Sequence, residues 1–179
     1  MFPTLETERL KLREITDSDV SSIFALFSNE QLTKYYGQDV LTDIDQAQAI
    51  VNVFANNYKG NRGIRWGIEL KETGQLIGTI GFHAWLPNHK RAEIGYEIHP
   101  DHWRKGYISE AIQAVLPYGF QQMELSRIGA FVFLENDASN QLLKKIGFQR
   151  EGILKKYMVQ NGESYDTNVY GLLKEYVSF

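Results

Sequence analysis

The spacing of hydrophobic positions changes along the chain, and these changes predict the order of the elements. Apolar and polar residues alternate at 9–13, which predicts a first strand. Apolar residues three and four apart then predict a helix over residues 20–27, capped by Asp17 or Ser18. The same spacing predicts a second helix that begins near Thr42 or Asp43 and runs to residue 58.

The middle of the chain returns to strand patterns. Residues 65–70 and 75–85 read as two strands joined by a turn that ends at Gly74. A third strand spans 91–99, and its central Gly95 indicates either a bulge or a close approach by the backbone of another segment or molecule. A long helix follows to about residue 123, with Pro117 expected to kink it.

The last part predicts a strand, a short helix and a hairpin. The strand covers 127–134 and reads as buried on both faces, and the short helix ends at Gly147. Two final strands, 148–157 and 165–173, flank Asn161-Gly162, a strong hairpin signal. The order β-α-α-β-β-β-α-β-α-β-β predicts one mixed α/β domain over residues 1–179 and disfavours a Rossmann fold.

Composition narrows the class of protein. The chain has 179 residues, a net charge of −3 and no cysteine. A disulfide framework, a thiolate zinc site and a cysteine nucleophile are therefore excluded, and general nucleic-acid binding is not expected. The sequence shows neither a targeting peptide nor an apolar run long enough to cross a membrane, which predicts a soluble, cytoplasmic protein.

One segment carries candidate chemistry. A strand runs into a loop with Arg104, Lys105 and Gly106, and a helix follows directly. Unpaired N–H groups at a helix N-terminus attract anions, and glycine lets the backbone approach a phosphate closely. Alone, the segment equally fits an ordinary strand-to-helix turn, since neither the dinucleotide nor the P-loop glycine motif is present.

Several stretches of the chain together form a recognisable set. The first two are Tyr96-Glu97-Ile98-His99-Pro100 and Trp103-Arg104-Lys105-Gly106-Tyr107-Ile108-Ser109-Glu110-Ala111. The others are residues 5–13, Ala92-Glu93-Ile94-Gly95-Tyr96, Asn136-Asp137-Ala138-Ser139-Asn140, residues 145–148, Glu151-Gly152 and residues 165–173. With this set the chain resembles the GNAT superfamily of N-acetyltransferases, and in particular its RimJ/RimL-like branch, which acetylates protein N-termini. The resemblance implies a central mixed, mostly antiparallel, twisted sheet of about seven strands flanked by about four helices.

The resemblance also implies that the co-substrate is acetyl-CoA. Its pyrophosphate would be held by the loop and first helical turn, and its pantetheine arm would pair with the strand near Glu97 and Ile98. Asn136 would contact the same molecule beyond the next strand. The loop residues in question are Trp103, Arg104, Lys105, Gly106, Tyr107, Ile108 and Ser109. Trp103 and Ile108 depart from the family pattern, and Ile108 is expected to crowd the phosphate.

Acetyl transfer to an amine needs a proton acceptor and a proton for the leaving thiolate. Glu93 is the first candidate for the general base, and the alternative is a carboxylate at the sheet surface paired with Arg91 or Lys90. Glu97 is the second candidate, and the alternative is a side chain that faces solvent. Ser139 matches the serine that related enzymes use as general acid, or it serves as a helix cap. Two tyrosines, Tyr157 and Tyr170, are further candidate acids.

Histidines and aromatics complete the candidate site. His83 is either a structural residue or an aid to deprotonation, and the pair His99 and His102 lacks the further ligands of a metal site. An acceptor cleft lined by aromatic side chains is expected, with these candidates: Tyr35, Tyr36, Trp66, Phe82 and Trp85.

Three functions remain open at this point. The first is an N-acetyltransferase that acts on a protein N-terminal α-amine, such as that of a ribosomal protein, as a monomer or a homodimer. The second acts on a small amine such as a polyamine, an amino acid or an aminoglycoside. A basic acceptor of this kind would fit an acidic cleft built from Glu30, Asp39, Asp43 and Asp45, which also read as helix caps and solvated faces. The third is a non-catalytic module that binds CoA.

Overall fold

An eight-stranded sheet forms the centre of the computed structural model, which describes all 179 residues. The strands are β1 (Leu5–Glu6), β2 (Leu10–Glu14), β3 (Ile64–Leu70), β4 (Leu76–Leu86), β5 (Arg91–Ile98), β6 (Arg127–Phe133), β7 (Gln149–Gln160) and β8 (Glu163–Leu173). Their order across the sheet is β1-β2-β3-β4-β5-β6-β8-β7. Every neighbouring pair is antiparallel except β5 and β6, which are parallel.

Five α-helices cover this sheet. They are α1 (Val20–Phe27), α2 (Glu30–Thr33), α3 (Ile44–Lys59), α4 (Tyr107–Pro117) and α5 (Asp137–Ile146). The mixed α/β fold and the predicted order of elements are confirmed. The structure adds the two-residue β1 and the four-residue α2, which are too short to show a hydrophobic period.

Local signals start and stop most elements as predicted. Asp43 caps α3, because its carboxylate accepts the N–H of Asp45. Asn161 and Gly162 both have positive φ, 51° and 76°, as a tight hairpin turn requires. The predicted cap of α1 is wrong: residues 17–19 form a 3₁₀ turn, and the carboxylate of Asp19 accepts the N–H of Thr16 instead.

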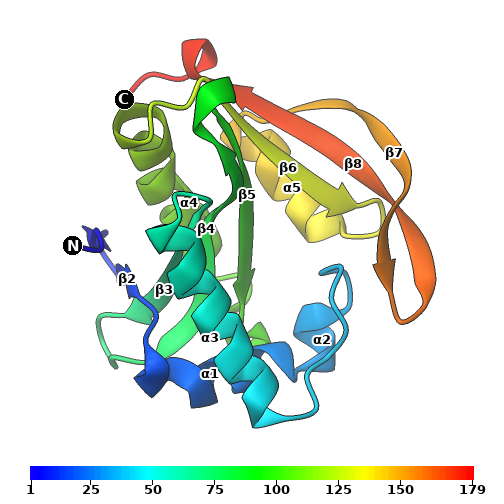
Figure 1. Cartoon of the computed structure of the whole chain (residues 1–179). Coiled ribbons are helices and arrows are strands. Elements are labelled where there is room, and N and C mark those ends of the chain that lie inside the picture. Colours follow the sequence, from blue (N-terminus) through cyan, green and yellow to red (C-terminus); the bar gives the residue numbers. More distant parts are fainter.

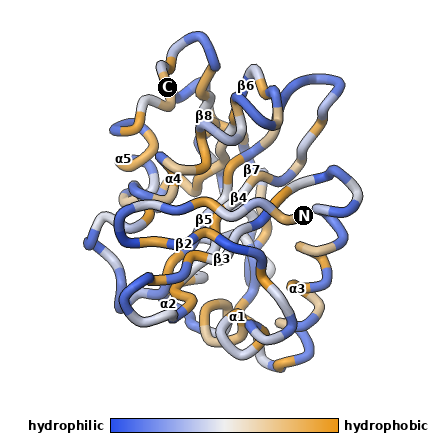
Figure 2. Tube along the Cα trace, turned by 90° about the vertical axis from the view of Figure 1, so that its left-hand side faces the viewer, coloured by the Kyte–Doolittle hydropathy of each residue, from blue (hydrophilic) through white to orange (hydrophobic).

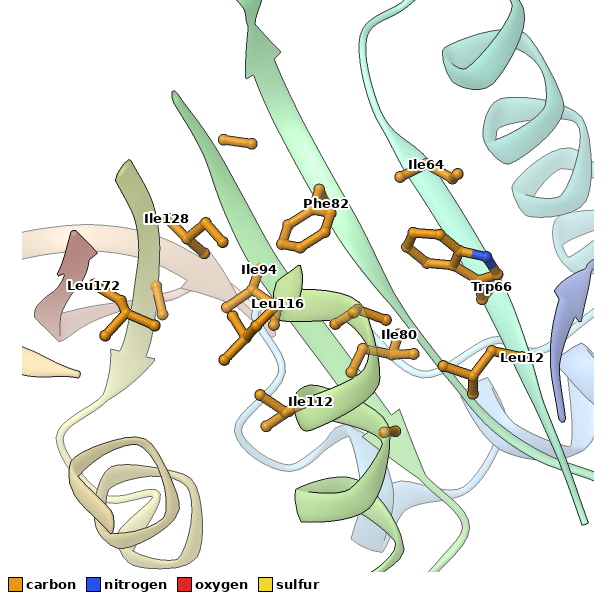
Figure 3. Close-up of a cluster of buried hydrophobic side chains, with 14 of the residues drawn as sticks. Leu12, Ile64, Trp66, Ile80, Phe82, Ile94, Ile112, Leu116, Ile128 and Leu172 are labelled. Atoms are coloured by element: carbon orange, nitrogen blue, oxygen red, sulfur yellow. The ribbon is translucent and has the colours of Figure 1, made fainter. Parts of the chain in front are cut away.

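Two hydrophobic clusters place the layers. The main cluster joins strands β2 to β6 and β8 to α4, where Ile112 and Leu116 face Ile80, Phe82 and Ile94 (Figure 3). The second cluster joins α1, α2 and α3 through side chains such as Ile23 and Val51. The sheet therefore lies between α4 and α5 on one side and α1 to α3 on the other (Figure 1). Hydrophilic segments gather in the connecting loops (Figure 2).

Pro117 ends α4, and the chain continues as one wider π-helical turn over Tyr118–Gln122. Proline has no N–H to donate to the preceding turn, so the regular hydrogen-bond pattern cannot pass through it unchanged. The predicted kink therefore takes the form of a change in helix type. No helix of the structure combines the length and the apolar character that a membrane crossing would need.

The parallel pair β5–β6 opens part of the way along the sheet. Pairing runs only from Arg91 opposite Arg127 to Glu93 opposite Gly129. Beyond this point β6 stays paired with β8, while β5 stays paired with β4. The two strands therefore diverge and leave a V-shaped opening in the sheet (Figure 1).

Candidate active site

A cavity of about 480 Å³ lies at the opening between β5 and β6. Most of its wall is apolar or aromatic, contributed by α1, α3, β5, β6, β7 and the segment after α2. Its polar side chains are those of Arg65, His83, Tyr96, Asn136 and Ser139, with Tyr36 and Gln38 nearer the α2 segment. The cavity thus brings together groups from both faces of the sheet.

Every second residue of β5 turns its backbone N–H and C=O groups toward this opening. The N–H of His99 donates to the carbonyl of Ile77 on the β4 side at 2.8 Å, so odd-numbered residues of β5 pair with β4. Ile94, Tyr96 and Ile98 therefore turn their N–H and C=O groups toward the open side. The indole Nε1 of Trp103 donates to the carbonyl of Ile98 at 2.9 Å, so this carbonyl at the end of β5 already has a hydrogen-bond partner.

The loop before α4 has the shape of an anion-binding turn. Arg104 and Gly106 have positive φ values of 59° and 80°, and Gly106 directly precedes the first residue of α4. Successive N–H groups in such a turn converge, and the helix N-terminus adds partial positive charge. Arg104 and Lys105 are exposed beside it, whereas Ile108 packs against the main core.

A clamp from the N-terminal strand region holds this loop. The Arg9 guanidinium donates to the carbonyl of Lys105 at 2.9 Å and pairs with the Glu110 carboxylate at 2.7 Å. Arg9 also lies 4.4 Å from the ring centre of Tyr107. Because the C=O and N–H of a trans peptide point in opposite directions, the bond at Lys105 turns the N–H of Gly106 away from Arg9.

Glu110 completes the clamp. Its carboxylate also accepts the hydroxyl of Thr7 at 2.5 Å and the backbone N–H of Arg9 at 2.9 Å. Burial raises the pKa of Glu110, but the hydrogen bonds from Thr7 and Arg9 lower it by a larger amount, so that the pKa falls below its ordinary value. The carboxylate therefore stays charged and keeps Arg9 in place.

Two hydroxyl groups of the cavity lining meet between β5 and α5. The hydroxyl of Tyr96 on β5 lies 2.6 Å from the Oγ of Ser139 on α5. Burial raises the pKa of Tyr96 to about 12, although the hydrogen bond with Ser139 opposes this. The helix cap is Asn136, whose side chain accepts the N–H of Ser139 at 3.3 Å. The Ser139 side chain is therefore left to hydrogen bond with Tyr96.

Asn140 fixes the turn that carries these groups. Its amide donates to the carbonyls of Phe133 at 3.1 Å and Asn136 at 2.9 Å. Its oxygen accepts from Asn168 at 2.9 Å and from the hydroxyl of Tyr170 at 2.7 Å. Tyr170, one of the alternative acids, thus has its proton committed to Asn140.

Glu93 on β5 and His83 on β4 form a pair. The carboxylate of Glu93 lies 3.2 Å from Nε2 of His83. His83 is half exposed and lines the cavity, whereas Glu93 lies behind it and does not. Gly95 leaves room for the imidazole: a Cβ at that position would lie 3.4 Å from its Nδ1. Glu93 does not pair with Lys90 or Arg91.

The Glu97 side chain does not face solvent; it is buried and pairs with Arg65. Its carboxylate lies 2.6 Å from Nη2 of Arg65 and also accepts the hydroxyl of Thr79. The backbone N–H and C=O groups of Glu97 face β4 and not the opening, where a pantetheine arm was expected to pair. The groups that face the opening are those of its neighbours Tyr96 and Ile98. Both of its carboxylate oxygens are occupied by Arg65 and Thr79.

The remaining candidates divide between cavity and core. Tyr35 and Tyr36 line the cavity, whereas Trp66 and Phe82 belong to the main core and Trp85 packs against it. Tyr157, the other alternative acid, is half exposed and stacks on Phe131 with ring centres 4.7 Å apart.

The predicted acidic cleft is not formed. The four carboxylates proposed for it do not line the cavity. Asp43 caps α3, and Asp39 accepts the N–H of Asn161. The two histidines of the loop also have local roles, since His99 accepts the N–H of Asp101 and His102 packs near Tyr107.

Several residues of the site gave no distinct signal in the sequence. Arg9 lies 96 positions from Lys105, and Tyr96 lies 43 positions from Ser139. Arg65 is one polar residue in an alternating strand. Their roles follow from the register of the sheet and the placement of α4 and α5, which no local pattern encodes.

Comparisons with known proteins agree with this geometry. A family model described as an acetyltransferase (GNAT) domain matches residues 9–149. The uncharacterized N-acetyltransferase YoaA of Bacillus subtilis is 59% identical over 174 residues, which cover 97% of this chain and 98% of that protein. The ribosomal-protein-serine acetyltransferase of Escherichia coli is 29% identical over 168 residues, 92% of each chain. The solved structure of RimL, a ribosomal-protein α-N-acetyltransferase in complex with coenzyme A, superposes with a TM-score of 0.85 at 22% identity over 96% of this chain and 98% of that one.

Proposed function

This chain belongs to the GNAT acetyltransferase family and is an N-acetyltransferase, and we propose that its acceptor is the α-amine of a protein N-terminus in the cytoplasm. The ribosomal-protein type of acceptor is supported by the similarity to the enzyme of Escherichia coli over almost the whole chain. One observation carries the proposal: a single cavity joins the Glu93–His83 pair to the Tyr96–Ser139 pair across the opening in the sheet.

The residues of the loop fit acetyl-CoA. The turn at Arg104 and Gly106 offers converging N–H groups for a diphosphate, with two basic side chains beside it. The open side of β5 offers backbone groups of Ile94 and Tyr96 to the amide groups of a pantetheine arm. Asn136 lines the cavity close to the same side.

When bound, acetyl-CoA supplies an acetyl thioester that an amine can attack directly. An α-amine has a pKa near 8, whereas a lysine side chain has a pKa near 10.4, so an α-amine needs little help to lose its proton. An imidazole can accept that proton near neutral pH. His83 faces the cavity and takes this role, while Glu93 holds its Nε2 side and stabilises the protonated ring.

The Tyr96–Ser139 pair supplies the proton for the departing sulfur. Both hydroxyls lie at the cavity, and the pKa of Tyr96, raised to about 12 by burial, keeps this residue protonated at neutral pH. Tyr96 can therefore donate a hydrogen bond to the sulfur as negative charge develops on it, and the thiol forms as the C–S bond breaks. The backbone N–H of Tyr96 points to the same opening and is placed to donate to a developing oxyanion.

The first experiment measures thiol release from acetyl-CoA with peptide, amino-acid and polyamine acceptors. We expect peptides with a free α-amine to be acetylated and the same peptides with a blocked N-terminus to be inert. Mass spectrometry of cellular N-termini with and without the gene then identifies the natural acceptor. Tight CoA binding without thiol release for every acceptor would instead support a non-catalytic module.

The proposed base is tested with two variants and a control. His83→Asn and Glu93→Gln should both lower kcat/KM and change its pH profile, with the larger loss at His83 because this residue faces the cavity. His89→Asn alters an exposed histidine outside the cavity and serves as the matched control. An unchanged profile in both test variants would remove this pair from the mechanism.

A further inference from the structure

We propose that Arg65 binds the first carbonyl oxygen of the acceptor, so that the enzyme selects α-aminoacyl groups over simple alkyl amines. This inference rests on the proposed function and names the feature of the acceptor that the cavity recognises. It places a specificity-determining residue on β3, a strand that carries none of the residues assigned to acetyl transfer above.

The hydrogen bonds of Arg65 leave one nitrogen free. Its Nε donates to the hydroxyl of Thr79 at 2.8 Å, and Nη2 donates to the hydroxyl of Tyr36 at 3.0 Å and to Glu97 at 2.6 Å. A guanidinium has five N–H donors, and these bonds use three. The two donors of Nη1 have no partner in the protein, although the side chain is only 10% exposed.

Nη1 is directed to the cavity through Gly95. A Cβ at Gly95 would lie 2.9 Å from Nη1, so any side chain there would cover this nitrogen. Gly95 and Arg65 both line the cavity. The prediction for Gly95 is therefore wrong in both forms: two side chains, Arg65 and His83, approach it instead of a backbone, and the irregularity in the β4–β5 pairing lies between His83 and Leu86.

Arg65 and His83 lie close enough together for one α-aminoacyl group to reach both. Nη1 of Arg65 and Nδ1 of His83 lie 2.9 and 3.4 Å from the same point above Gly95. In an α-amino acid residue the nitrogen and the carbonyl oxygen are separated by three bonds, or roughly 3 Å. An amine that gives its proton to His83 can therefore place its carbonyl oxygen at Arg65.

The local charge favours an uncharged oxygen. Arg65 is neutralised by Glu97, and His83 has Glu93 as its partner. The other walls near them are apolar or aromatic, and no unpaired carboxylate lines the cavity. A peptide carbonyl can take the free donors without bringing a second charge, whereas a polyamine finds no anion to pair with its additional ammonium groups.

The arrangement is held rigid before a ligand binds. Tyr36, Thr79 and Glu97 fix the guanidinium plane from three sides. The segment that carries Tyr36 is tied to the β7–β8 hairpin, because Gly37 donates to the side chain of Gln160 at 2.9 Å. A preorganised donor discriminates strongly, since it stays unpaired when the wrong ligand occupies the cavity.

The test compares acceptors that differ in one group. Alaninamide carries the carbonyl, sec-butylamine lacks it, free alanine carries a carboxylate instead, and spermidine carries additional ammonium groups. We expect kcat/KM to be higher for alaninamide than for each of the other three. A preference for free alanine or for spermidine would overturn the inference.

Two variants then assign the preference to Arg65. Gly95→Ala places a methyl group against Nη1, and Arg65→Lys keeps a charge for Glu97 but removes the second donor nitrogen. Each should reduce the ratio of kcat/KM for alaninamide over sec-butylamine by about 10- to 100-fold, as expected for a hydrogen bond from a charged donor. Gly152→Ala, where an added Cβ meets no atom within 4 Å, is the control.

The outcomes separate this inference from the proposed function. If both amines are acetylated and Gly95→Ala leaves their ratio unchanged, Arg65 does not recognise the carbonyl, while the acetyltransferase assignment stands. If CoA binds but no amine is acetylated, the proposed function itself fails. Unchanged CoA affinity and melting temperature in both variants confirm that the protein is folded in either case.

Discussion

Removal of the Arg9 side chain tests whether the N-terminal strand region shapes the coenzyme loop. Arg9→Ala deletes the hydrogen bond to the carbonyl of Lys105, the ion pair with Glu110 and the contact with the ring of Tyr107. The backbone of the loop is then free to rotate at Lys105, so that the N–H of Gly106 is no longer directed toward a bound diphosphate. We therefore expect weaker binding of CoA in a folded protein.

The size of the effect follows from the exposure of the side chain. Hydrogen bonds that involve a charged group contribute about 1.5 to 3 kcal/mol when protected from water. Arg9 is 42% exposed, so we use the lower end for the Lys105 contact and assign about 0.5 kcal/mol or less to the ion pair. The total of about 1.5 to 2 kcal/mol corresponds to a roughly 10- to 30-fold increase in Kd.

Isothermal calorimetry with CoA measures this directly, and steady-state kinetics should show a higher KM for acetyl-CoA with little change in kcat. Arg9→Lys separates position from charge, because lysine keeps the charge but cannot bond to Lys105 and Glu110 at the same time. Arg127→Ala removes another arginine–glutamate pair, at 2.5 Å, and should leave Kd unchanged, because Arg127 lies opposite Arg91 at the start of β5 whereas the loop follows the end of that strand. Wild-type affinity in Arg9→Lys, or equal losses in Arg9→Ala and Arg127→Ala, would refute the clamp.

Further variants test the remaining parts of the site. Gly106→Ala forces a side chain into a backbone with a φ of 80°, at a cost of about 1 to 2 kcal/mol, and should raise the Kd of CoA at least fivefold by calorimetry. Tyr96→Phe should lower kcat about tenfold and change KM little. Because the pKa of Tyr96 is raised to about 12, the pH profile of the wild-type rate should show no ionisation of this group up to pH 10. Ser139→Ala should give a smaller loss of kcat in the same assay, because Tyr96 keeps its own proton. Asn140→Leu leaves buried carbonyls without a donor and should lower the free energy of unfolding by about 2 kcal/mol in urea titrations. The pKa of Glu110 is lower in the folded protein than its ordinary value of 4.5, so its carboxylate stabilises the fold fully above that value. This stabilisation is lost as the pH falls through the lower pKa of the folded state. The melting temperature of Glu110→Gln should therefore depend less on pH below about pH 5 than that of the wild type.

Much of the fold is encoded in local patterns. Hydrophobic spacing predicted the order of the elements, and turn residues placed their ends, as at Asp43, Gly147 and Asn161-Gly162. These signals act between residues a few positions apart, through backbone dihedral angles and nearby hydrogen bonds, so the sequence states them directly. The loop at Gly106 was identified for the same reason, and the resemblance to a known family gave it a ligand.

The chemistry of the cavity depends on residues that are distant in sequence. Whether Glu93 meets Lys90, Arg91 or His83 is decided by the register of β4 against β5, and a shift of one residue would turn the side chain to the other face of the sheet. The register also places Arg65 over Gly95. The sequence by itself therefore determined the elements and the glycine turn before α4 that we propose binds the coenzyme, because dihedral preferences and periodicity are local. Only the tertiary structure decided which side chains share the cavity, because their distances depend on how whole strands and helices pack.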